Sequence, residues 1–429
     1  MAIALVKSKE ISPARVAAFN ILQQVENGAF SSVLLVAEEA NLQPLDRALC
    51  HELVLGVLRW QLFLDKIVEH FSKRRVESLD AAVRIALRLG LYQLRFLTRV
   101  PASAAVNESV SLVRVARLSS ATAFVNAVLR RAVRESNYDP VGEISDPLEK
   151  ISVQTSHPVW LIERWASQFG IDEAEAFARA NNTVPPTAFR VVANRANQSE
   201  ILSRLSAAGA TLESSDIVNG AWRVSGATSL LREMSSAGEI YLQDQASQLA
   251  ADVMEVKRGE RVLDLCAAPG GKTTLIADRA VDKAFIVAAD RSATRMATVI
   301  STTRLHELKS ITPLILDATE QLPFERASFD RVLVDAPCSG TGTLRANPEI
   351  RWRLAPKDFV TFAHQQKRIL SRAVEVLKPG GRLVYSTCSV EREENEEVIE
   401  TLNLKPVKTL RTWPHREGAD GFFVGIFQK

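Results

Sequence analysis

The 429-residue sequence contains no apolar run near the roughly 18 residues that a membrane-spanning helix requires. Its first segment, MAIALVKSKEISPAR, has too short an apolar stretch for a secretory signal peptide. Hydrophobic residues make up 46% of the chain and charged residues 24%, a composition typical of globular proteins. We therefore expect a soluble, cytoplasmic protein of two or three domains.

Cysteine and histidine are scarce. The four cysteines, Cys50, Cys266, Cys338 and Cys388, include no CxxC pair, and the six histidines are widely spaced. This pattern argues against a zinc site and against a disulfide framework, so we expect no metal. Three of the cysteines lie beyond residue 260, each at the end of a predicted strand.

The excess of one charge is small and unevenly placed. The net charge is +3, but residues 1–145 carry 18 Lys and Arg against 14 Asp and Glu, and 14 of the 18 are arginine. Arginine on helices forms either a solvated face or a surface for a polyanion such as nucleic acid. Composition alone leaves both possibilities open.

The segment 261–276, RVLDLCAAPGGKTTLI, looks like a phosphate-binding loop but lacks its first glycine. Cys266 and Ala267 stand where that glycine would begin the tight turn, and no GxGxxG fingerprint occurs in the chain. Triphosphate and dinucleotide loops are therefore excluded. We expect Pro269–Gly271 to bring the backbone close to another nucleotide-like ligand, and Thr273–Thr274 to cap the following helix.

Residues 1–145 are predicted to form an all-helical bundle. In Ala82–Leu97, apolar residues recur at spacings of three and four, which places them along one helix face. At least five such segments with short connections favour a compact bundle. They are Pro13–Asn27, Asp46–Phe71, Ala82–Leu97, Ala104–Ala116 and Ala121–Glu135.

The pattern changes twice further along the chain. Residues 150–240 mix helical and strand-like segments around Pro185–Pro186, which predicts a small α+β linking domain. Residues 241–429 alternate strand and helix, which predicts a doubly wound, Rossmann-like parallel sheet that binds ligands beyond the carboxyl ends of its strands. The strands expected there are Arg261–Leu265, Ala284–Ala289, Ile311–Leu316, Arg331–Val334, Arg382–Ser386 and Phe422–Phe427.

Carboxylates follow several of these strands. Asp290 lies about 20 residues beyond the glycine turn, where a doubly wound fold places an acid on ribose hydroxyls. The same aspartate could also cap the next helix, and both roles could hold at once. Asp317 ends the next strand, where it could accept from an adenine amino group. Ribose and adenine contacts without a phosphate loop favour S-adenosylmethionine over NAD or ATP.

Two cysteines follow neighbouring predicted strands. Val332–Gly342 reads VLVDAPCSGTG, with Asp335 and Cys338, and Cys388 follows in LVYSTCSVEREEN. A thiolate that adds to C6 of a pyrimidine makes C5 nucleophilic enough to accept a methyl group. Both cysteines stand in polar turns at the ligand edge, which favours catalysis over burial as small apolar residues. The spacing does not say which of them is the nucleophile.

Four ordered segments, LDLCAAPGGKT, LVDAPCSGTG, YSTCSVEREEN and DGFFVGIF, together resemble the RNA (cytosine-5) methyltransferases of the NOL1/NOP2/Sun family. DRALCHELVLGVLR resembles part of a NusB-like bundle, and SHPVWLIERW and NNTVPPTAFRV resemble the linking domain of these enzymes. The domain order is similar to that of bacterial 16S ribosomal RNA methyltransferases of the RsmB/Sun/Fmu type. It implies a NusB-like RNA-binding domain at 1–145, a linking domain at 150–240 and a catalytic domain at 241–429.

The resemblance also implies an activity and its residues. Cys388 would attack C6 of a cytosine in 16S ribosomal RNA, and Cys338 would assist release of the methylated base. We expect S-adenosylmethionine as methyl donor and a monomer that acts before the subunit is fully assembled. The implied S-adenosylmethionine contacts are Cys266, Ala267, Ala268, Pro269, Gly270, Gly271, Lys272, Asp290, Asp317 and Asp335.

Three alternatives stay open at this point. The protein could be a non-catalytic NusB-like RNA-binding protein, although both cysteines and all the strand-end acids are present. It could methylate another RNA. An amino-group methyltransferase is disfavoured because no aromatic residue follows Asp335-Ala336-Pro337.

Overall fold

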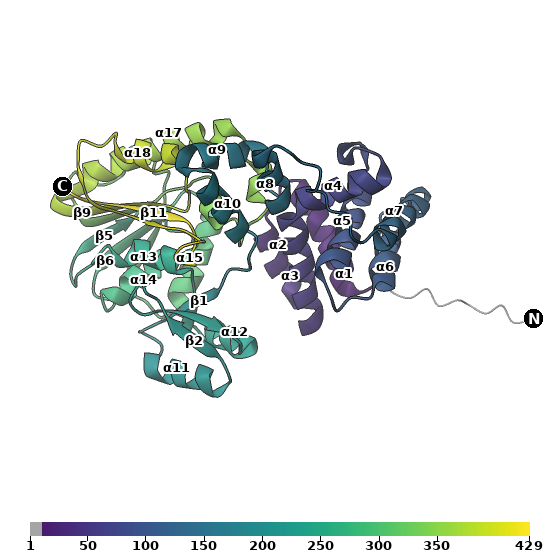
Figure 1. The fold of residues 1–429 in the computed structure, drawn as a ribbon. Helices are drawn as coiled ribbons and strands as arrows, with labels where there is room; N and C mark the ends of the chain where they lie inside the picture. The colour runs from purple at the N-terminus through teal and green to yellow at the C-terminus, as the bar shows by residue number, and fades with distance from the viewer. Residues whose placement is uncertain (1–10) are drawn as a thin grey trace, which may run out of the picture. The chain divides into compact units, whose positions relative to one another are not determined.

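The computed structural model describes residues 11–429, which form two compact units (Figure 1). Unit 1 is the chain up to Thr183 together with Leu344–Arg353, and unit 2 is Val184–Thr343 together with Leu354–Lys429. Residues 1–10, and with them most of the segment in which we expect no signal peptide, lie outside the described range. No helix within 11–429 is long and apolar enough to cross a membrane.

Unit 1 is helical, and α5 lies at its centre, packed against α1, α3, α4, α6 and α7. Asp80 caps α5 by accepting from the Ala82 amide at 2.9 Å, and Asp146 caps α8 by accepting from the Glu149 amide at 2.7 Å. The α-helices are α1 (Pro13–Glu26), α2 (Ser31–Glu38), α3 (Pro44–Arg59), α4 (Gln61–Ser72), α5 (Ala81–Phe96), α6 (Ala102–Val115), α7 (Thr122–Arg134), α8 (Pro147–Thr155), α9 (Val159–Phe169), α10 (Ile171–Ala180) and α16 (Ile350–Arg353). Three 3₁₀ turns connect them, η1 (Glu39–Asn41), η2 (Val76–Ser78) and η3 (Ser119–Ala121).

Two glycines allow α5 to pack closely. A β-carbon on Gly56 of α3 would stand 2.0 Å from the Tyr92 ring, and one on Gly90 would stand 2.7 Å from the Leu129 side chain. The predicted helical segment 46–71 is helical but consists of two helices, because the chain breaks at Trp60 between α3 and α4. Trp60 has φ −104° and stacks on Phe96 at 4.9 Å between ring centroids, so tertiary packing ends the helix without glycine or proline.

Several arginines of the bundle are internal ion-pair partners. Arg88 of α5 is buried and donates to both carboxylate oxygens of Asp65 at 2.7 and 2.8 Å. It also contacts Glu26 at 3.0 Å, and Glu26 accepts from Arg84 at 2.7 Å as well. These arginines form ion pairs with carboxylates of the bundle, so they are not available to bind a polyanion.

The segment Leu344–Arg353 belongs to unit 1 although it lies far along the chain. Its Arg351 is fully buried and donates to the Ser156 carbonyl at 3.1 Å and to the Asn182 side-chain oxygen at 2.9 Å. Trp352 donates its indole N–H to the Leu58 carbonyl at 2.8 Å, and Glu349 accepts from the Ser31 amide and hydroxyl at 2.9 Å each. Burial and the neighbouring Arg59 hold the pKa of Arg351 well below its usual range.

Unit 2 begins with a four-stranded antiparallel sheet of order β2-β3-β1-β4. Its strands and helices are β1 (Thr187–Val191), α11 (Gln198–Ala207), β2 (Thr211–Ser214), β3 (Ala221–Ser225), α12 (Thr228–Ser236) and β4 (Ile240–Leu242). The expected α+β character of this region is present. The helices α8 to α10, which lie largely within the predicted linking domain 150–240, instead belong to unit 1, and the boundaries at 145 and 240 stay a prediction.

The second sheet of unit 2 has seven strands in the order β10-β11-β9-β8-β5-β6-β7. In Figure 1, α17 and α18 lie on one face and α13, α14 and α15 on the other, and each face has its own apolar core. The elements are α13 (Gln245–Asp252), β5 (Arg261–Asp264), α14 (Gly271–Arg279), β6 (Phe285–Asp290), α15 (Ala293–Leu305), β7 (Ile311–Ile315), β8 (Phe329–Asp335), η4 (Thr341–Thr343), α17 (Pro356–Val376), β9 (Leu377–Thr387), η5 (Arg392–Glu394), α18 (Glu396–Ile399), β10 (Pro406–Thr412) and β11 (Phe422–Gln428).

The sheet is parallel from β9 to β7, but the predicted wholly parallel sheet is wrong at one edge. β11 runs antiparallel to β9 and to β10, a strand that the sequence analysis missed. Residues 413–421 join β10 to β11, and this connection is shorter than the dozen or more residues that a parallel crossover needs. A hairpin is therefore the only pairing available to these two strands.

Replacing Arg351 by alanine is expected to destabilise the protein by about 2–4 kcal/mol, because buried carbonyl groups of unit 1 lose their donor. Thermal unfolding should show a fall of several degrees in the melting temperature of the variant. Arg99→Ala, at an exposed position of the same unit, is the control. Equal melting temperatures for the two variants would contradict this role of Arg351.

Candidate active site

The carboxyl ends of β5, β6, β8 and β9 meet at one edge of the seven-stranded sheet, as parallel pairing requires. The loops that follow these strands surround a cavity of about 280 Å³. Seven of the predicted site residues line it, namely Cys266, Ala268, Asp290, Asp317, Asp335, Cys338 and Cys388. Residues that were not predicted as site residues also contribute, namely Leu265, Arg291, Arg295, Leu316, Ala318, Ala336, Pro337, Gln365 and Ile369.

The two predicted catalytic cysteines lie side by side in this cavity. Their sulfur atoms are 3.3 Å apart, within hydrogen-bond distance. Hydrogen bonds join their loops, because the Gly342 amide donates to the Cys388 carbonyl at 2.9 Å and the Val390 amide donates to the Thr341 hydroxyl at 3.1 Å. Both sulfur atoms could therefore contact the same planar ring bound in the cavity.

The surroundings of Cys338 favour its neutral form. The hydrogen bond with Cys388, burial, and the negative charge of Glu394 together raise the pKa of Cys338 well above its ordinary value. Cys338 is thus held as a neutral thiol within hydrogen-bond distance of the Cys388 sulfur.

The other two cysteines have different settings. Cys50 is buried in unit 1, and burial followed by the charges of Glu38 and Asp46 raises its pKa to about 12. Cys266 lines the cavity, but burial and the charges of Asp264 and Asp335 raise its pKa well above the ordinary value. Neither is prepared to act as a nucleophile.

Three charged groups lie beside the cysteine pair. Lys272 donates to one oxygen of Asp335 at 2.7 Å, and the Ser386 hydroxyl donates to the other at 2.8 Å. Burial acts to lower the pKa of Lys272, but the charge of Asp335 and the hydrogen bond with it raise it. Asp264, which the sequence analysis did not name, is buried nearby, and burial raises its pKa to about 7.

Asp290 ends β6 and faces the cavity. One of its oxygens accepts from the Ser292 amide at 2.9 Å, and the other accepts from the Ala268 amide at 3.3 Å. A carboxylate has about four lone-pair sites, so acceptor capacity remains for hydroxyl groups of a ligand. Arg295 lies 3.6 Å from Asp290 and is about half exposed. The alternative role as a helix cap is wrong, because Ser292 caps α15 by accepting from the Arg295 amide.

Asp317 lies one strand further out, after β7. One of its oxygens accepts from both the amide and the hydroxyl of Thr319, at 2.9 and 2.6 Å. These two hydrogen bonds hold the pKa of Asp317 below its ordinary value. Leu316 and Ile369 line the same cavity as Asp317, so the cavity offers both an acceptor and apolar surface.

The two glycines of the turn have a packing role. Gly270 has φ +108°, which favours glycine, and a β-carbon there would stand 3.3 Å from Val299 of α15. A β-carbon on Gly271 would stand 2.8 Å from the Tyr241 ring. Both glycines thus allow close packing of α14 on its neighbours. Among the predicted contacts, Ala267, Pro269, Gly270, Gly271 and Lys272 do not line the cavity directly.

The predicted capping of α14 by Thr273 and Thr274 is wrong. Gly270 is the residue before the helix, and no side chain caps it. Both threonines lie inside the first turn, where Thr273 donates to Asp264 at 2.6 Å and Thr274 donates to the Gly270 carbonyl at 2.9 Å. Their hydroxyls therefore satisfy buried groups within unit 2.

Sequence reasoning missed a set of polar residues behind the cysteines. Each cysteine is followed by a serine, and a buried glutamate and asparagine follow the second cysteine at short range. These residues are Ser339, Ser389, Glu394 and Asn395, and Gln366 of α17 joins them. The sequence SVEREEN could have indicated these residues. Charged side chains that follow a buried loop need hydrogen-bond partners.

Asp264 predicts a pH dependence of stability. Its folded pKa of about 7 exceeds the ordinary 3.8, so the folded state binds the proton more tightly and stability falls as pH rises from about 4 to 7. Asp264→Asn removes this loss, which amounts to about 3–4 kcal/mol. Relative to that of the wild type, the melting temperature of the variant should be higher at pH 8 than at pH 5.

The matched control is Asp216→Asn, at an exposed position of unit 2. A difference between wild type and Asp264→Asn that is the same at both pH values would contradict the shifted pKa.

The comparisons with known proteins agree on the whole chain. A family model described as 16S rRNA methyltransferase RsmB/F matches residues 251–407. The NusB family model matches residues 12–134, and a model for the ferredoxin-like domain of RsmF/B-like methyltransferases matches residues 157–230. The predicted fold class is confirmed, with a NusB-like bundle, an α+β module and a Rossmann-like methyltransferase domain.

Individual relatives match over nearly their full length. The probable ribosomal RNA small subunit methyltransferase B of Bacillus subtilis is 32% identical over 98% of this chain and 99% of its own. The ribosomal RNA small subunit methyltransferase B of Pseudomonas putida is 35% identical over 90% of this chain and 87% of its own. The crystal structure of PH0851 has a TM-score of 0.84 at 28% identity and covers 99% of this chain and 100% of its own.

Proposed function

Since the chain belongs to the ribosomal RNA small subunit methyltransferase B family, we propose that it methylates C5 of a cytosine in 16S ribosomal RNA through a covalent bond between Cys388 and C6. The observation that carries this proposal is the pair of sulfur atoms 3.3 Å apart at the ligand edge of the sheet. We further propose that the enzyme acts in the cytoplasm as a monomer, on RNA that is not yet fully assembled into the subunit.

The residues of the cavity fit S-adenosylmethionine. Asp290 keeps acceptor capacity for sugar hydroxyls, and Asp317 with Leu316 and Ile369 offers an acceptor beside apolar surface, as an adenine ring requires. No group of three or more His, Cys, Asp or Glu residues within 11–429 is placed to hold a metal ion. When bound, S-adenosylmethionine would supply the methyl group as an electrophile on sulfur.

The thiol pair explains how a cytosine becomes reactive. The Cys388 thiolate adds to C6, and the electron pair of the C5–C6 double bond moves into the ring, which makes C5 nucleophilic. After C5 has accepted the methyl group, it loses its proton, and the electron pair of that C–H bond expels the Cys388 sulfur. Cys338 lies beside the bond that breaks and would assist this release.

Asp335 would hold the base. It lines the cavity at the end of β8 together with both cysteines, and its ion pair with Lys272 fixes its carboxylate. That carboxylate can accept from the N4 amino group of cytosine. A base must leave its stack to reach this cavity, which favours a single-stranded or locally open RNA.

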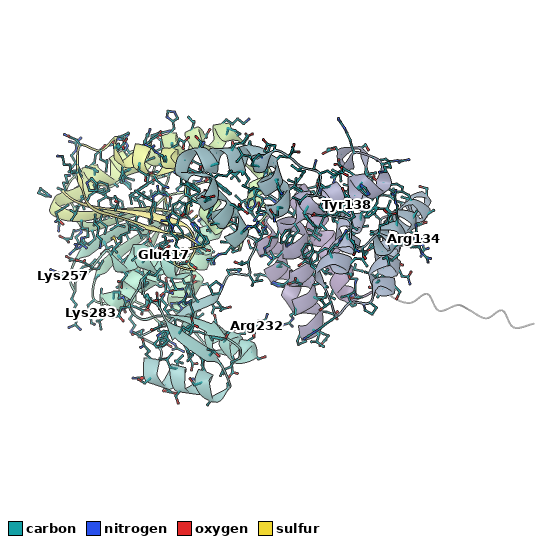
Figure 2. All side chains as sticks on the ribbon, in the orientation of Figure 1. Arg134, Tyr138, Arg232, Lys257, Lys283 and Glu417 are labelled. Atoms are coloured by element: carbon teal, nitrogen blue, oxygen red, sulfur yellow. The ribbon has the colours of Figure 1, made fainter. Side chains whose placement is uncertain are left out.

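A groove on unit 1 supports an RNA partner. Two adjoining hollows of about 370 and 450 Å³ follow α6 and α7 and share Asn107. Their linings include Arg114, Arg130 and Arg134 and no carboxylate. Arg134, labelled in Figure 2, lies in the last turn of α7. All three arginines are exposed, in contrast to the paired Arg88, so we propose that this groove binds phosphates.

The covalent step predicts which variant traps RNA. Cys338→Ala mixed with deproteinised 16S RNA and S-adenosylmethionine should accumulate a protein–RNA adduct on a denaturing gel, because release is impaired while attack is intact. Wild type and Cys388→Ala should show none, and Cys50→Ala should behave like wild type. An adduct with Cys388→Ala would indicate that the roles of the two cysteines are the reverse of those proposed. The absence of both adduct and methylation in every protein would contradict the proposed function.

The groove predicts a change in salt dependence. Replacing Arg114, Arg130 and Arg134 together by glutamine should weaken 16S RNA binding and lower the slope of log K against log salt by roughly 0.7–0.9 per lost phosphate contact. The turnover number at saturating RNA should not change, because the cavity of unit 2 is intact. Binding titrations at several salt concentrations, with Arg99→Gln as control, test this. An unchanged slope would contradict the groove as a phosphate site.

A further inference from the structure

Each catalytic cysteine is followed by a serine, and the two serines meet behind the cysteine pair. The hydroxyls of Ser339 and Ser389 are 3.1 Å apart. Both contact the same oxygen of Glu394, at 2.5 Å from Ser339 and 2.8 Å from Ser389. One carboxylate oxygen thus joins the residue after Cys338 to the residue after Cys388.

The second oxygen of Glu394 holds the same loop from another side. It accepts from the Ser339 amide at 2.8 Å and from the Gln366 side chain of α17 at 3.1 Å. The same Gln366 nitrogen donates to the Pro337 carbonyl at 2.9 Å. The residues on both sides of Cys338 are therefore tied, directly or through Gln366, to one carboxylate.

Glu394 is itself firmly held. The Tyr385 hydroxyl donates to its carbonyl at 2.5 Å. The adjacent Asn395 accepts from the Thr387 hydroxyl at 2.5 Å and donates to the Ser389 carbonyl at 2.9 Å. Thr387 and Ser389 flank Cys388, so the η5–α18 segment contacts the chain on either side of that cysteine.

The burial of Glu394 is not explained by charge neutralisation. The residue has no exposed surface, and no Lys, Arg or His of the described range forms an ion pair with it. Burial raises its pKa, and the hydrogen bonds from Ser339, Ser389 and Gln366 oppose that effect. A buried carboxylate of this kind costs stability even when it is hydrogen-bonded, which points to a role other than stability.

We propose that Glu394 is a positioning residue that sets the distance between the Cys338 and Cys388 sulfur atoms. The inference rests on the proposed function for its catalytic meaning, but the positioning itself is a property of the unliganded protein. With the carboxylate removed, the two loops keep the Gly342–Cys388 backbone bond and the contacts of the Thr341 hydroxyl, but the two serine hydroxyls lose their shared acceptor. A displacement of about 1 Å at a reacting group can lower the rate by about 100-fold.

The first test measures how readily the Cys338 and Cys388 sulfur atoms approach each other, and it needs no methyl transfer. A diazene oxidant takes up two hydrogens and becomes a hydrazine, while the two thiols lose them and form an S–S bond. We expect Glu394→Ala to form the Cys338–Cys388 disulfide about 10-fold more slowly than wild type, measured by peptide mass mapping after timed quenching. The control is Glu397→Gln, an exposed residue of α18.

The second test separates turnover from binding. Glu394→Ala should lower the turnover number about 10- to 100-fold and leave the dissociation constant of S-adenosylmethionine within about threefold, because the cofactor-facing acids are elsewhere. Glu394→Gln should recover most of the turnover, since its amide oxygen still accepts and the serine hydroxyls can rotate to accept from its nitrogen. If Glu394→Ala does not fold, the Ser339→Ala/Ser389→Ala double variant replaces it with the same expectation.

The outcomes are distinguishable. A disulfide rate equal to that of wild type would overturn the positioning role, whatever the activity. Equal losses of turnover, cofactor affinity and melting temperature would also overturn it, because they would indicate a general structural role. Slower disulfide formation in a protein whose wild type does not methylate RNA would support the positioning role and contradict the proposed function instead.

Discussion

The parallel pairing of β8 and β9 is the constraint on which the site depends. In this register Asp335 lies opposite Ser386, so the loops that follow the two strands start side by side. Cys338 and Cys388 are 50 positions apart in sequence but have sulfur atoms 3.3 Å apart in the fold. A slip of one residue in that register would turn one loop to the other face of the sheet and separate the thiols.

The charged groups around the two thiols differ. Glu394 and the hydrogen bond to Cys388 keep the proton on Cys338. Lys272 lies on the other side, paired with Asp335, and its positive charge interacts with Cys388. The sequence contains no histidine or lysine next to either cysteine, and the structure supplies the lysine from the first turn of α14. The charged groups around the cysteine pair are therefore supplied by the fold rather than by sequence neighbours.

The sequence analysis predicted the three-part fold class and the acids and cysteines at the strand ends, because strands followed by turn residues mark that edge of a parallel sheet. It did not predict β10 or the antiparallel direction of β11, since both depend on which partner an edge strand finds. The ligand role of Gly270–Gly271 stays a prediction, and both glycines also allow close packing against Val299 and Tyr241. Asp264 and Glu394 were missed because their importance comes from burial, which no local pattern displays.

The most direct test of the account is to identify the residue bound to the base. RNA that carries 5-fluorocytosine in place of cytosine retains the S–C6 bond, because C5 has no proton to lose after methylation. Wild-type protein would be trapped on such 16S RNA with S-adenosylmethionine, digested with protease and nuclease, and mapped by mass spectrometry. The account predicts a nucleotide on the peptide that contains Cys388. A nucleotide on the Cys338 peptide would contradict it.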